Sequence, residues 1–352
     1  MAKHKGKLVS LSDDLKSLQQ GTNDDLSGTL LFGDATNSLS GMAQGGNDNL
    51  HGAASLPTDF VAIYGDTFLM VDSSRGGNDS IFGADFLISG VNDLFGDARY
   101  IFDNAQGGND YLKGGDFGNI NNIFGDAWSL GEGAGGNDVL VGGTESSVNI
   151  MYGDAQIISP QAFGGDDTIS AGTGTSQNFL FGDSEVLYGK GGSDVLTGAN
   201  VQYGENILYG DAYEINSGAV GGNDVLQAGN ATVNTLFGDA RFATGNITCG
   251  DDVLISGNGV DRLWGDTQQI TNGQQITGAD RFVLAPGNND DTIYDFESGQ
   301  DLIDLTAFGF ASVQDIRMTL DPAGNFQIQF ADGGTLTLIG VTLLQLESDI
   351  LI

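Results

Sequence analysis

The sequence predicts an all-β protein, a parallel β-helix or β-roll solenoid of about nine coils with about 29 residues per coil and a C-terminal β-rich cap. Two short phrases alternate nine times between Gly21 and Asp266, and the second phrase recurs with a mean period of 29 residues. A fixed period of this size is typical of a solenoid, in which each repeat buries its apolar face only by stacking on its neighbours. The 57 glycines argue against a helical repeat, because each costs about 1 kcal/mol inside a helix.

Three segments follow one another along the chain. Residues 1–20 form a leader, in which Ser12 is the expected N-cap of one or two helical turns that would cover the open end of the solenoid. Residues 21–277 form the array of repeats. Residues 278–352, where glycine thins and apolar residues alternate with polar ones, form the C-terminal β cap and are expected to contain antiparallel strands.

The first phrase of each coil reads Gly-Gly-Asn-Asp-x-Leu, as in residues 221–226, and predicts a short strand bounded by glycine. Asp side chains in glycine-flanked loops suit a hard cation, because they hold carboxylate oxygens close to backbone carbonyls. The first-phrase aspartates, our leading metal candidates, are Asp24, Asp48, Asp79, Asp110, Asp138, Asp167, Asp194, Asp224 and Asp252.

The second phrase reads aromatic-Gly-Asp, as in residues 237–239, and ends a second strand. A third short strand is expected after it, because an apolar residue recurs four places after the Asp. The second-phrase aspartates, also metal candidates, are Asp34, Asp66, Asp97, Asp126, Asp154, Asp183, Asp211, Asp239 and Asp266.

The composition narrows the classes of partner. The net charge is −35, and 40 of the 47 acidic residues are Asp, placed periodically rather than scattered. Nucleic acid is not expected as a partner, because the only basic cluster is Lys3, Lys5 and Lys7. No stretch is long and apolar enough for a transmembrane helix. The single cysteine, Cys249, stands where other repeats have Gly, and we interpret it as a small buried substitute.

The stacking of equivalent carboxylates predicts bound cations. Parallel strands lie about 4.8 Å apart, so neighbouring carboxylates would repel by roughly 3 kcal/mol per pair at an effective dielectric constant of about 20. Summed over two rows, this repulsion exceeds the net stability of an ordinary domain. Several Ca²⁺ ions are the expected cofactors, because calcium takes oxygen ligands, whereas zinc would need His or Cys, of which there are three in all.

The repeats resemble those of the RTX (haemolysin-type) proteins. Residues 256–264 (SGNGVDRLW) fit positions two to nine of their nonapeptide G-G-x-G-x-D-x-U-x, and the first phrases look like its second half. The resemblance covers about 250 residues. It implies a β-roll whose Asp oxygens and loop carbonyls bind calcium between coils and which folds only with calcium. The resemblance adds Asp261, Asp280 and Asp291 to the candidate ligands.

Two features depart from that family. Tandem nonapeptides would give an 18-residue coil, whereas this coil has about 29 residues. In addition, most second phrases carry Asn where Asp261 stands, and neutral Asn can stack and hydrogen-bond to itself without a metal. This row, expected to be an asparagine ladder, comprises Asn92, Asn121, Asn149, Asn178, Asn206 and Asn234.

The aromatic residue before each Gly-Asp is unbroken along the array. It is either an exposed stripe that binds sugar or a partner surface, or a buried row covered by the additional residues of each coil. We favour the buried alternative, because an open stripe of nine aromatics would aggregate. The row comprises Phe32, Tyr64, Phe95, Phe124, Tyr152, Phe181, Tyr209, Phe237 and Trp264.

The C-terminal segment resembles the export region of RTX proteins such as the serralysins. The matching stretches are residues 278–283, 289–296 and 299–305, together with an acid followed by apolar residues at the end. The resemblance implies an uncleaved C-terminal signal for type I secretion, consistent with the absence of an apolar signal-peptide core in residues 1–20. We therefore expect an extracellular or cell-surface protein.

The sequence favours a binding or structural role over catalysis. Only 20 residues precede the array, and the sequence contains no H-E-x-x-H, G-x-S-x-G or P-loop motif. We expect no enzyme, although a polysaccharide lyase or epimerase on the solenoid remains an alternative. The leading hypothesis is a calcium-dependent structural, surface-layer, matrix or adhesive protein that self-assembles or contacts polysaccharide. The alternative is a secreted glycan-binding or signalling protein.

Overall fold

The computed structural model describes residues 12–56, 58–118, 120–201, 203–287, 289–341 and 346–352. Lys3, Lys5 and Lys7 lie outside the described residues. The chain divides into two compact units, residues 1–168 and 169–352, and each is described by itself.

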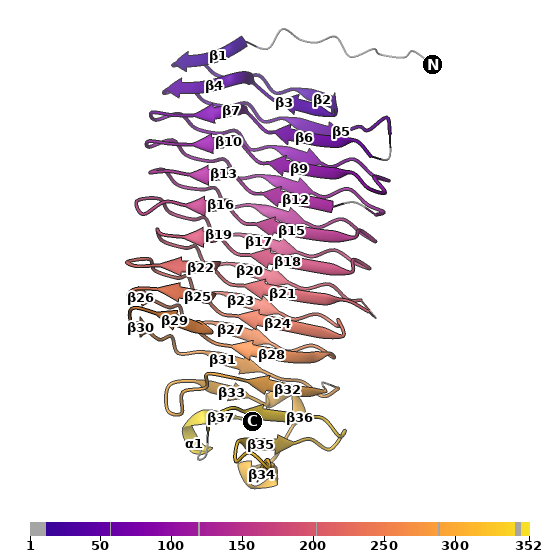
Figure 1. The fold of residues 1–352 in the computed structure, drawn as a ribbon, viewed down its shortest axis with the longest axis vertical. Helices are drawn as coiled ribbons and strands as arrows, with labels where there is room; N and C mark the ends of the chain where they lie inside the picture. Colours follow the sequence, from indigo (N-terminus) through magenta and orange to yellow (C-terminus); the bar gives the residue numbers. More distant parts are fainter. Residues whose placement is uncertain (1–11, 57, 119, 202, 288, 342–345) are drawn as a thin grey trace. The chain divides into compact units, whose positions relative to one another are not determined.

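In unit 1, three parallel sheets are built from one strand each per coil (Figure 1). The first sheet follows the Gly-Gly-Asn-Asp phrases, the second sheet ends at the aromatic residues, and the third sheet starts after Gly-Asp. The first sheet contains β2 (Asp25–Gly28), β5 (Asn49–Gly52), β8 (Ser80–Phe82), β11 (Tyr111–Lys113) and β14 (Val139–Val141). The second contains β3 (Leu30–Phe32), β6 (Phe60–Tyr64), β9 (Val91–Phe95), β12 (Ile120–Phe124) and β15 (Val148–Tyr152). The third contains β1 (Ser12–Ser17), β4 (Ala35–Gly41), β7 (Thr67–Met70), β10 (Ala98–Ile101), β13 (Ala127–Leu130) and β16 (Ala155–Ile158).

Strand β17 (Thr168–Ser170) falls at the boundary, and unit 2 repeats the three-sheet pattern. Its first sheet contains β20 (Val195–Thr197), β23 (Val225–Gln227), β27 (Val253–Ile255), β31 (Arg281–Val283), β33 (Leu302–Asp304) and β37 (Ile350–Leu351). Its second contains β18 (Gln177–Phe181), β21 (Glu205–Tyr209), β24 (Val233–Phe237), β28 (Val260–Trp264), β32 (Asp290–Ile293), β36 (Thr335–Leu338), β35 (Phe326–Gln329) and β34 (Arg317–Leu320). Its third contains β19 (Ser184–Leu187), β22 (Ala212–Asn216), β25 (Ala240–Thr244) and β29 (Gln269–Thr271), and β26 (Ile247–Thr248) pairs with β30 (Gln275–Ile276).

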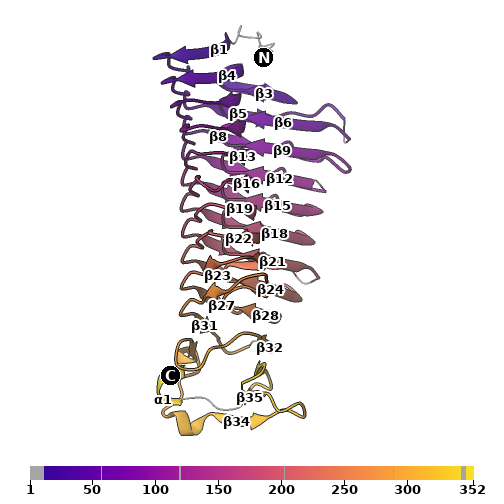
Figure 2. The same cartoon turned by 60° about the vertical axis from the view of Figure 1, so that its left-hand side comes forward.

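The predicted all-β solenoid is confirmed within each unit. Equivalent strands pair in parallel at every step, as β6, β9 and β12 do in Figure 2. Equivalent positions are 32 residues apart between Leu31 and Ile63 and 27 apart between Leu236 and Leu263. Helix among the described residues is confined to α1 (Leu346–Asp349) and two 3-10 turns, η1 (Thr306–Phe308) and η2 (Val313–Asp315).

The interior of each unit is lined by one apolar row from every sheet. In unit 1, Leu112, Ile123 and Ile101 represent the three rows, and none of the three side chains is exposed. The Ile101 row confirms the predicted third strand, because the apolar residue four places after each second-phrase Asp is buried in β7, β10, β13, β16, β19, β22 and β25.

At the two ends of the array, the predicted helical start is wrong and the predicted antiparallel pairing is confirmed. Residues 12–17 form strand β1 rather than helical turns, because they pair with β4 and bury Leu15. The expected antiparallel pairing of β35 with β36 is confirmed. Strand β31, beyond residue 278, continues the parallel pairing of β27.

Candidate metal-binding carboxylate rows

Both series of phrase aspartates lie inside the coils. In the first series every side chain except half-buried Asp24 is at most 3% exposed, and in the second series the maximum is 5%, at Asp34. The chain turns at Gly-Asp, runs along the third sheet and returns through Gly-Gly-Asn-Asp. The amide of Gly108 accordingly donates to both carboxylate oxygens of Asp97, at 3.0 and 3.1 Å. The second phrase of one coil therefore meets the first phrase of the next coil in space.

The first-series carboxylates are linked from coil to coil through one oxygen only. The amide of Asp48 donates to Oδ1 of Asp79, and the amide of Asp79 donates to Oδ1 of Asp110, both at 2.7 Å. In several of these carboxylates the other oxygen, Oδ2, is buried and has no hydrogen-bond donor in the described part of the chain. Such Oδ2 atoms belong to Asp48, Asp79, Asp110, Asp138, Asp224, Asp252 and Asp280.

All of these Oδ2 atoms except that of Asp280 lie beside a backbone carbonyl. A Cβ placed on Gly96 would overlap both Oδ2 of Asp110 and the carbonyl oxygen of Gly125 in the next coil. Only glycine leaves room there, and the space is bounded by two oxygen acceptors. We call this arrangement the carbonyl cradle; it recurs at Gly33, Gly65, Gly96, Gly125, Gly182, Gly210 and Gly238.

The second-series carboxylates converge in pairs at the first glycine of the other phrase. A Cβ on Gly221 would overlap Oδ1 of Asp239 and Oδ2 of Asp211, which belong to adjacent coils. Oδ1 of Asp211 accepts from the amide of Gly222 at 2.6 Å, whereas its buried Oδ2 has no donor among the described residues. We call this arrangement the carboxylate cradle; it recurs at Gly107, Gly135, Gly191 and Gly221.

Burial and mutual repulsion both oppose ionisation of these carboxyls. Burial raises the pKa of Asp110 well above its usual range, and the charge of Asp138 raises it further. Burial raises the pKa of Asp48 to about 7 and that of Asp211 to about 6. An adjacent cation would remove this penalty, because it favours the ionised form.

The asparagine row forms the expected ladder. Nδ2 of Asn92 donates to Oδ1 of Asn121, and Nδ2 of Asn121 donates to Oδ1 of Asn149, each at 2.9 Å. In unit 2 the ladder ends at Asp261, whose Oδ1 accepts from Asn234 at 2.6 Å and whose Oδ2 accepts from the amide of Gly257. Both oxygens of Asp261 thus have donors, which makes it a weaker metal ligand than the resemblance implied.

The aromatic row is a buried stack, as the structural alternative predicted. From Tyr64 to Trp264 every member is at most 8% exposed, and Phe32 is half-buried. The ring of Phe95 lies between those of Tyr64 and Phe124, with centroids 4.9 and 4.7 Å away. Side chains of the third sheet contact these rings, as Arg99 does over Phe95 and Trp128 does beside Phe124. The alternative prediction, an exposed stripe that binds a ligand at these residues, is therefore wrong.

The first-series row continues beyond the array. Oδ1 of Asp280 accepts from the amide of Asp252, and Oδ1 of Asp301 accepts from the amide of Asp280.

Asp291, fully buried, accepts from the amide of Asp261 at 3.0 Å. Sequence reasoning missed Asp301, although Gly-Gln-Asp-Leu-Ile at residues 299–303 matches the Gly-Asn-Asp-x-Leu of a first phrase. It also missed Asp295, whose pKa burial raises to about 7.

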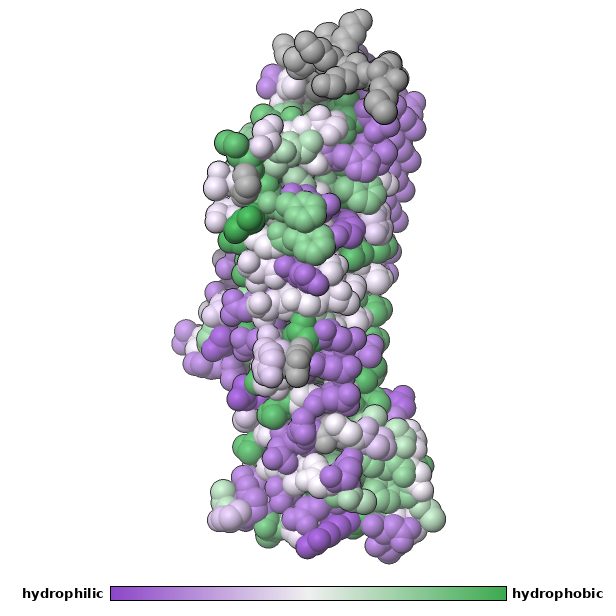
Figure 3. Space-filling view, turned by 90° about the vertical axis from the view of Figure 1, so that its right-hand side faces the viewer, coloured by the Kyte–Doolittle hydropathy of each residue, from purple (hydrophilic) through white to green (hydrophobic). Residues whose placement is uncertain are grey.

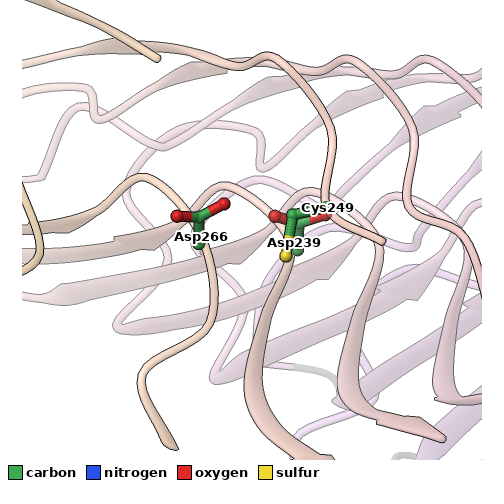
Figure 4. A group of neighbouring side chains, drawn as sticks. All are labelled: Asp239, Cys249 and Asp266. Atoms are coloured by element: carbon green, nitrogen blue, oxygen red, sulfur yellow. The ribbon is translucent and has the colours of Figure 1, made fainter. Parts of the chain in front are cut away.

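One place brings three potential ligand side chains together. Within the described residues, Asp239, Cys249 and Asp266 form the only group of three His, Cys, Asp or Glu side chains whose ligand atoms all lie within 4.8 Å of one another (Figure 4). Elsewhere a cation would depend on the carbonyl oxygens as well as on the carboxylates. Cys249 is buried, as predicted, but its carboxylate neighbours were not foreseen.

Comparisons of the chain with protein-family models, with curated proteins and with solved structures gave no match. The RTX resemblance therefore rests on the repeat residues themselves. None of the helices in the described residues has the length and apolar character needed to cross a membrane.

Proposed function

We propose that this chain is a secreted calcium-binding β-solenoid that folds when Ca²⁺ enters the two kinds of cradle. It would reach the cell surface or exterior by a type I route and act there as a structural, surface-layer, matrix or adhesive protein. The carbonyl cradle carries this proposal, because it repeats along both units with the same chemistry.

The proposal follows from the buried carboxylate oxygen of the carbonyl cradle, which lacks a hydrogen-bond donor among the described residues. Oδ2 of Asp110 and the carbonyl oxygen of Gly125 are both acceptors, both border the space at Gly96, and no described residue donates to Oδ2. A buried acceptor without a donor costs free energy, and a buried unpaired charge costs more. A hard cation that binds oxygen satisfies both atoms. Calcium suits a row of carboxylates and carbonyls, because it accepts six to eight oxygen ligands in flexible geometry.

Calcium-dependent folding would couple export to structure. Without calcium the carboxylate rows repel, so the chain stays unfolded in a low-calcium cytosol. Outside the cell, binding free energy becomes folding free energy, since the cradles exist only in the stacked coils. The resemblance of residues 278–305 to type I export regions supports this order of events.

The test is circular dichroism of the full chain in EGTA, followed by titration with calcium and, separately, with magnesium. We expect little β signal in EGTA, a cooperative gain with calcium, and a smaller response to magnesium, which demands octahedral geometry. Asp110→Asn should weaken the calcium response, whereas Asp25→Asn, at an exposed position, should not. A chain that is fully folded in EGTA at neutral pH would refute the proposal.

A second candidate, binding of a glycan or protein partner, is favoured by the arms between the first and second sheets. Figure 3 shows apolar side chains at the surface of the face from which these arms emerge. In unit 1, Phe86 and Phe117 are 63% and 42% exposed, and their rings stack with centroids 4.9 Å apart. Binding of the calcium-loaded protein to a polysaccharide, lost on Phe86→Ala, would support this function; unchanged binding in that variant would exclude these rings.

A further inference from the structure

Cys249 occupies the carboxylate cradle of its coil. Its amide donates to the carbonyl of Ile276 at 2.9 Å, as the amide of Gly221 donates to Thr248 at 2.8 Å one coil earlier. A Cβ at Gly221 would point at the two carboxylates of its cradle. At Cys249 that Cβ is present and carries a thiol.

The carboxylates around this thiol are those of adjacent coils. Asp239, Cys249 and Asp266 are 0%, 8% and 3% exposed, and one ligand atom of each lies within 4.8 Å of the others (Figure 4). Oδ1 of Asp239 accepts from the amide of Gly250 at 2.8 Å, whereas its fully buried Oδ2 has no donor in the part of the chain that the structure describes. This unpartnered oxygen is a second observation, independent of the cysteine, that indicates a ligand.

We propose that Asp239, Cys249 and Asp266 form one site for a thiophilic divalent cation such as Zn²⁺ or Cd²⁺. A thiolate and two carboxylates supply one soft and two hard anionic ligands, a set that zinc accepts in tetrahedral sites with water or a carbonyl as the fourth ligand. Calcium is disfavoured here, because it binds oxygen almost exclusively. On binding, the metal–sulfur bond replaces the S–H bond and the thiol proton passes to solvent.

The inference goes beyond the proposed calcium function, because it concerns one coil and a different class of metal. The remaining coils carry Gly at this place or, at Thr277, a residue that offers no soft ligand. The site is therefore expected to bind a single ion, whereas calcium would bind at many places.

The test uses the only cysteine of the chain as its own reporter. The full chain is unfolded in chelator and reductant, refolded with calcium, and titrated with CdCl₂ while the ultraviolet sulfur-to-cadmium charge-transfer absorption is recorded. We expect a band that saturates at one equivalent and is absent in Cys249→Ser. Asp239→Asn should weaken cadmium binding by at least about tenfold, since even outer-shell partners contribute 10- to 100-fold.

Two controls separate this site from the calcium function. Cys249→Gly restores the residue of the other coils, so it should fold with calcium like the parent chain and give no band. If the parent folds without calcium, the cadmium titration still reports on the thiol. The proposal would be overturned if the folded parent chain gave no band, or if Asp239→Asn and Asp266→Asn bound cadmium as tightly as the parent chain. Cys249 would then be only a space-filling residue.

Discussion

Acidification should fold the calcium-free chain, whereas acid unfolds most proteins. The pKa of Asp211 is raised from 3.8 to about 6, mainly by burial, and that of Asp280 to about 9. A carboxyl whose pKa is higher in the folded state binds its proton more tightly there. The resulting stability is present below the unfolded pKa and is lost as pH rises through the folded pKa. A shift of one pKa unit corresponds to 1.36 kcal/mol. Asp211 alone therefore lowers the free energy of unfolding by about 3 kcal/mol as the pH rises from about 4 to 7.

Many carboxyls contribute in the same direction. Burial raises the pKa of Asp79, Asp138 and Asp224 well above the usual range, and the charge of a neighbouring carboxylate raises each further. The summed loss therefore exceeds the 5–15 kcal/mol net stability typical of a domain. In EGTA we expect the chain to be unfolded at pH 7.5 and to gain β structure on titration to pH 5, which is above its isoelectric point of about 4.1.

The assay is circular dichroism across this pH range in EGTA, with a parallel series in calcium, where the β signal should persist at pH 7.5. A third series in EGTA with about 1 M NaCl, where the Debye length is about 3 Å, removes most repulsion between surface charges. Folding at pH 7.5 in salt alone would assign the effect to the surface rather than to the buried rows. A calcium-free chain whose urea stability falls from pH 8 to pH 5 would refute the reasoning.

Three substitutions test the rows separately, the first by the pH titration in EGTA and the other two by urea unfolding. Asp110→Asn removes one buried charge, so it should raise the pH midpoint of folding in EGTA and lower the apparent affinity for calcium; a lower pH midpoint would contradict this account. Asn206→Ala removes five hydrogen bonds, two to Ala199 and one each to Asn178, Ala228 and Asn234, and should cost about 5 kcal/mol at saturating calcium, at about 1 kcal/mol per bond. Phe95→Ala should cost about 3–5 kcal/mol, because the ring is fully buried, and a cost under 1 kcal/mol would show that the stack contributes little.

The repeat made most of each coil predictable. A residue that recurs at the same place in every coil must meet its own copies, so the asparagine and aromatic rows could be foreseen as ladders. Residues 12–17 could not be predicted in this way, since they carry no phrase. Their local preference for a helical start is overridden by pairing with β4, where Ser38 donates to Asp14 at 2.8 Å.

The cradles were only half predictable. Periodicity identified every carboxylate of the two series, but not that Gly96, Asp110 and Gly125 meet at one point, because this depends on where the chain turns back. The same limit applies to Cys249. Its replacement of glycine is visible in the sequence, whereas its two carboxylate neighbours come from residues 10 and 17 positions away, on opposite sides.

The neutral and charged rows divide the control of folding between them. The asparagine and aromatic ladders fix the register of the coils, because a slip of one residue would separate Asn121 from Asn149 and Phe95 from Phe124. These ladders carry no charge and offer the same stabilisation with or without calcium. The carboxylate rows oppose the same stacking until a cation or a proton neutralises them. A chain built from both can respond sharply to calcium, since the neutral rows specify one stacked arrangement and the charged rows decide whether it forms.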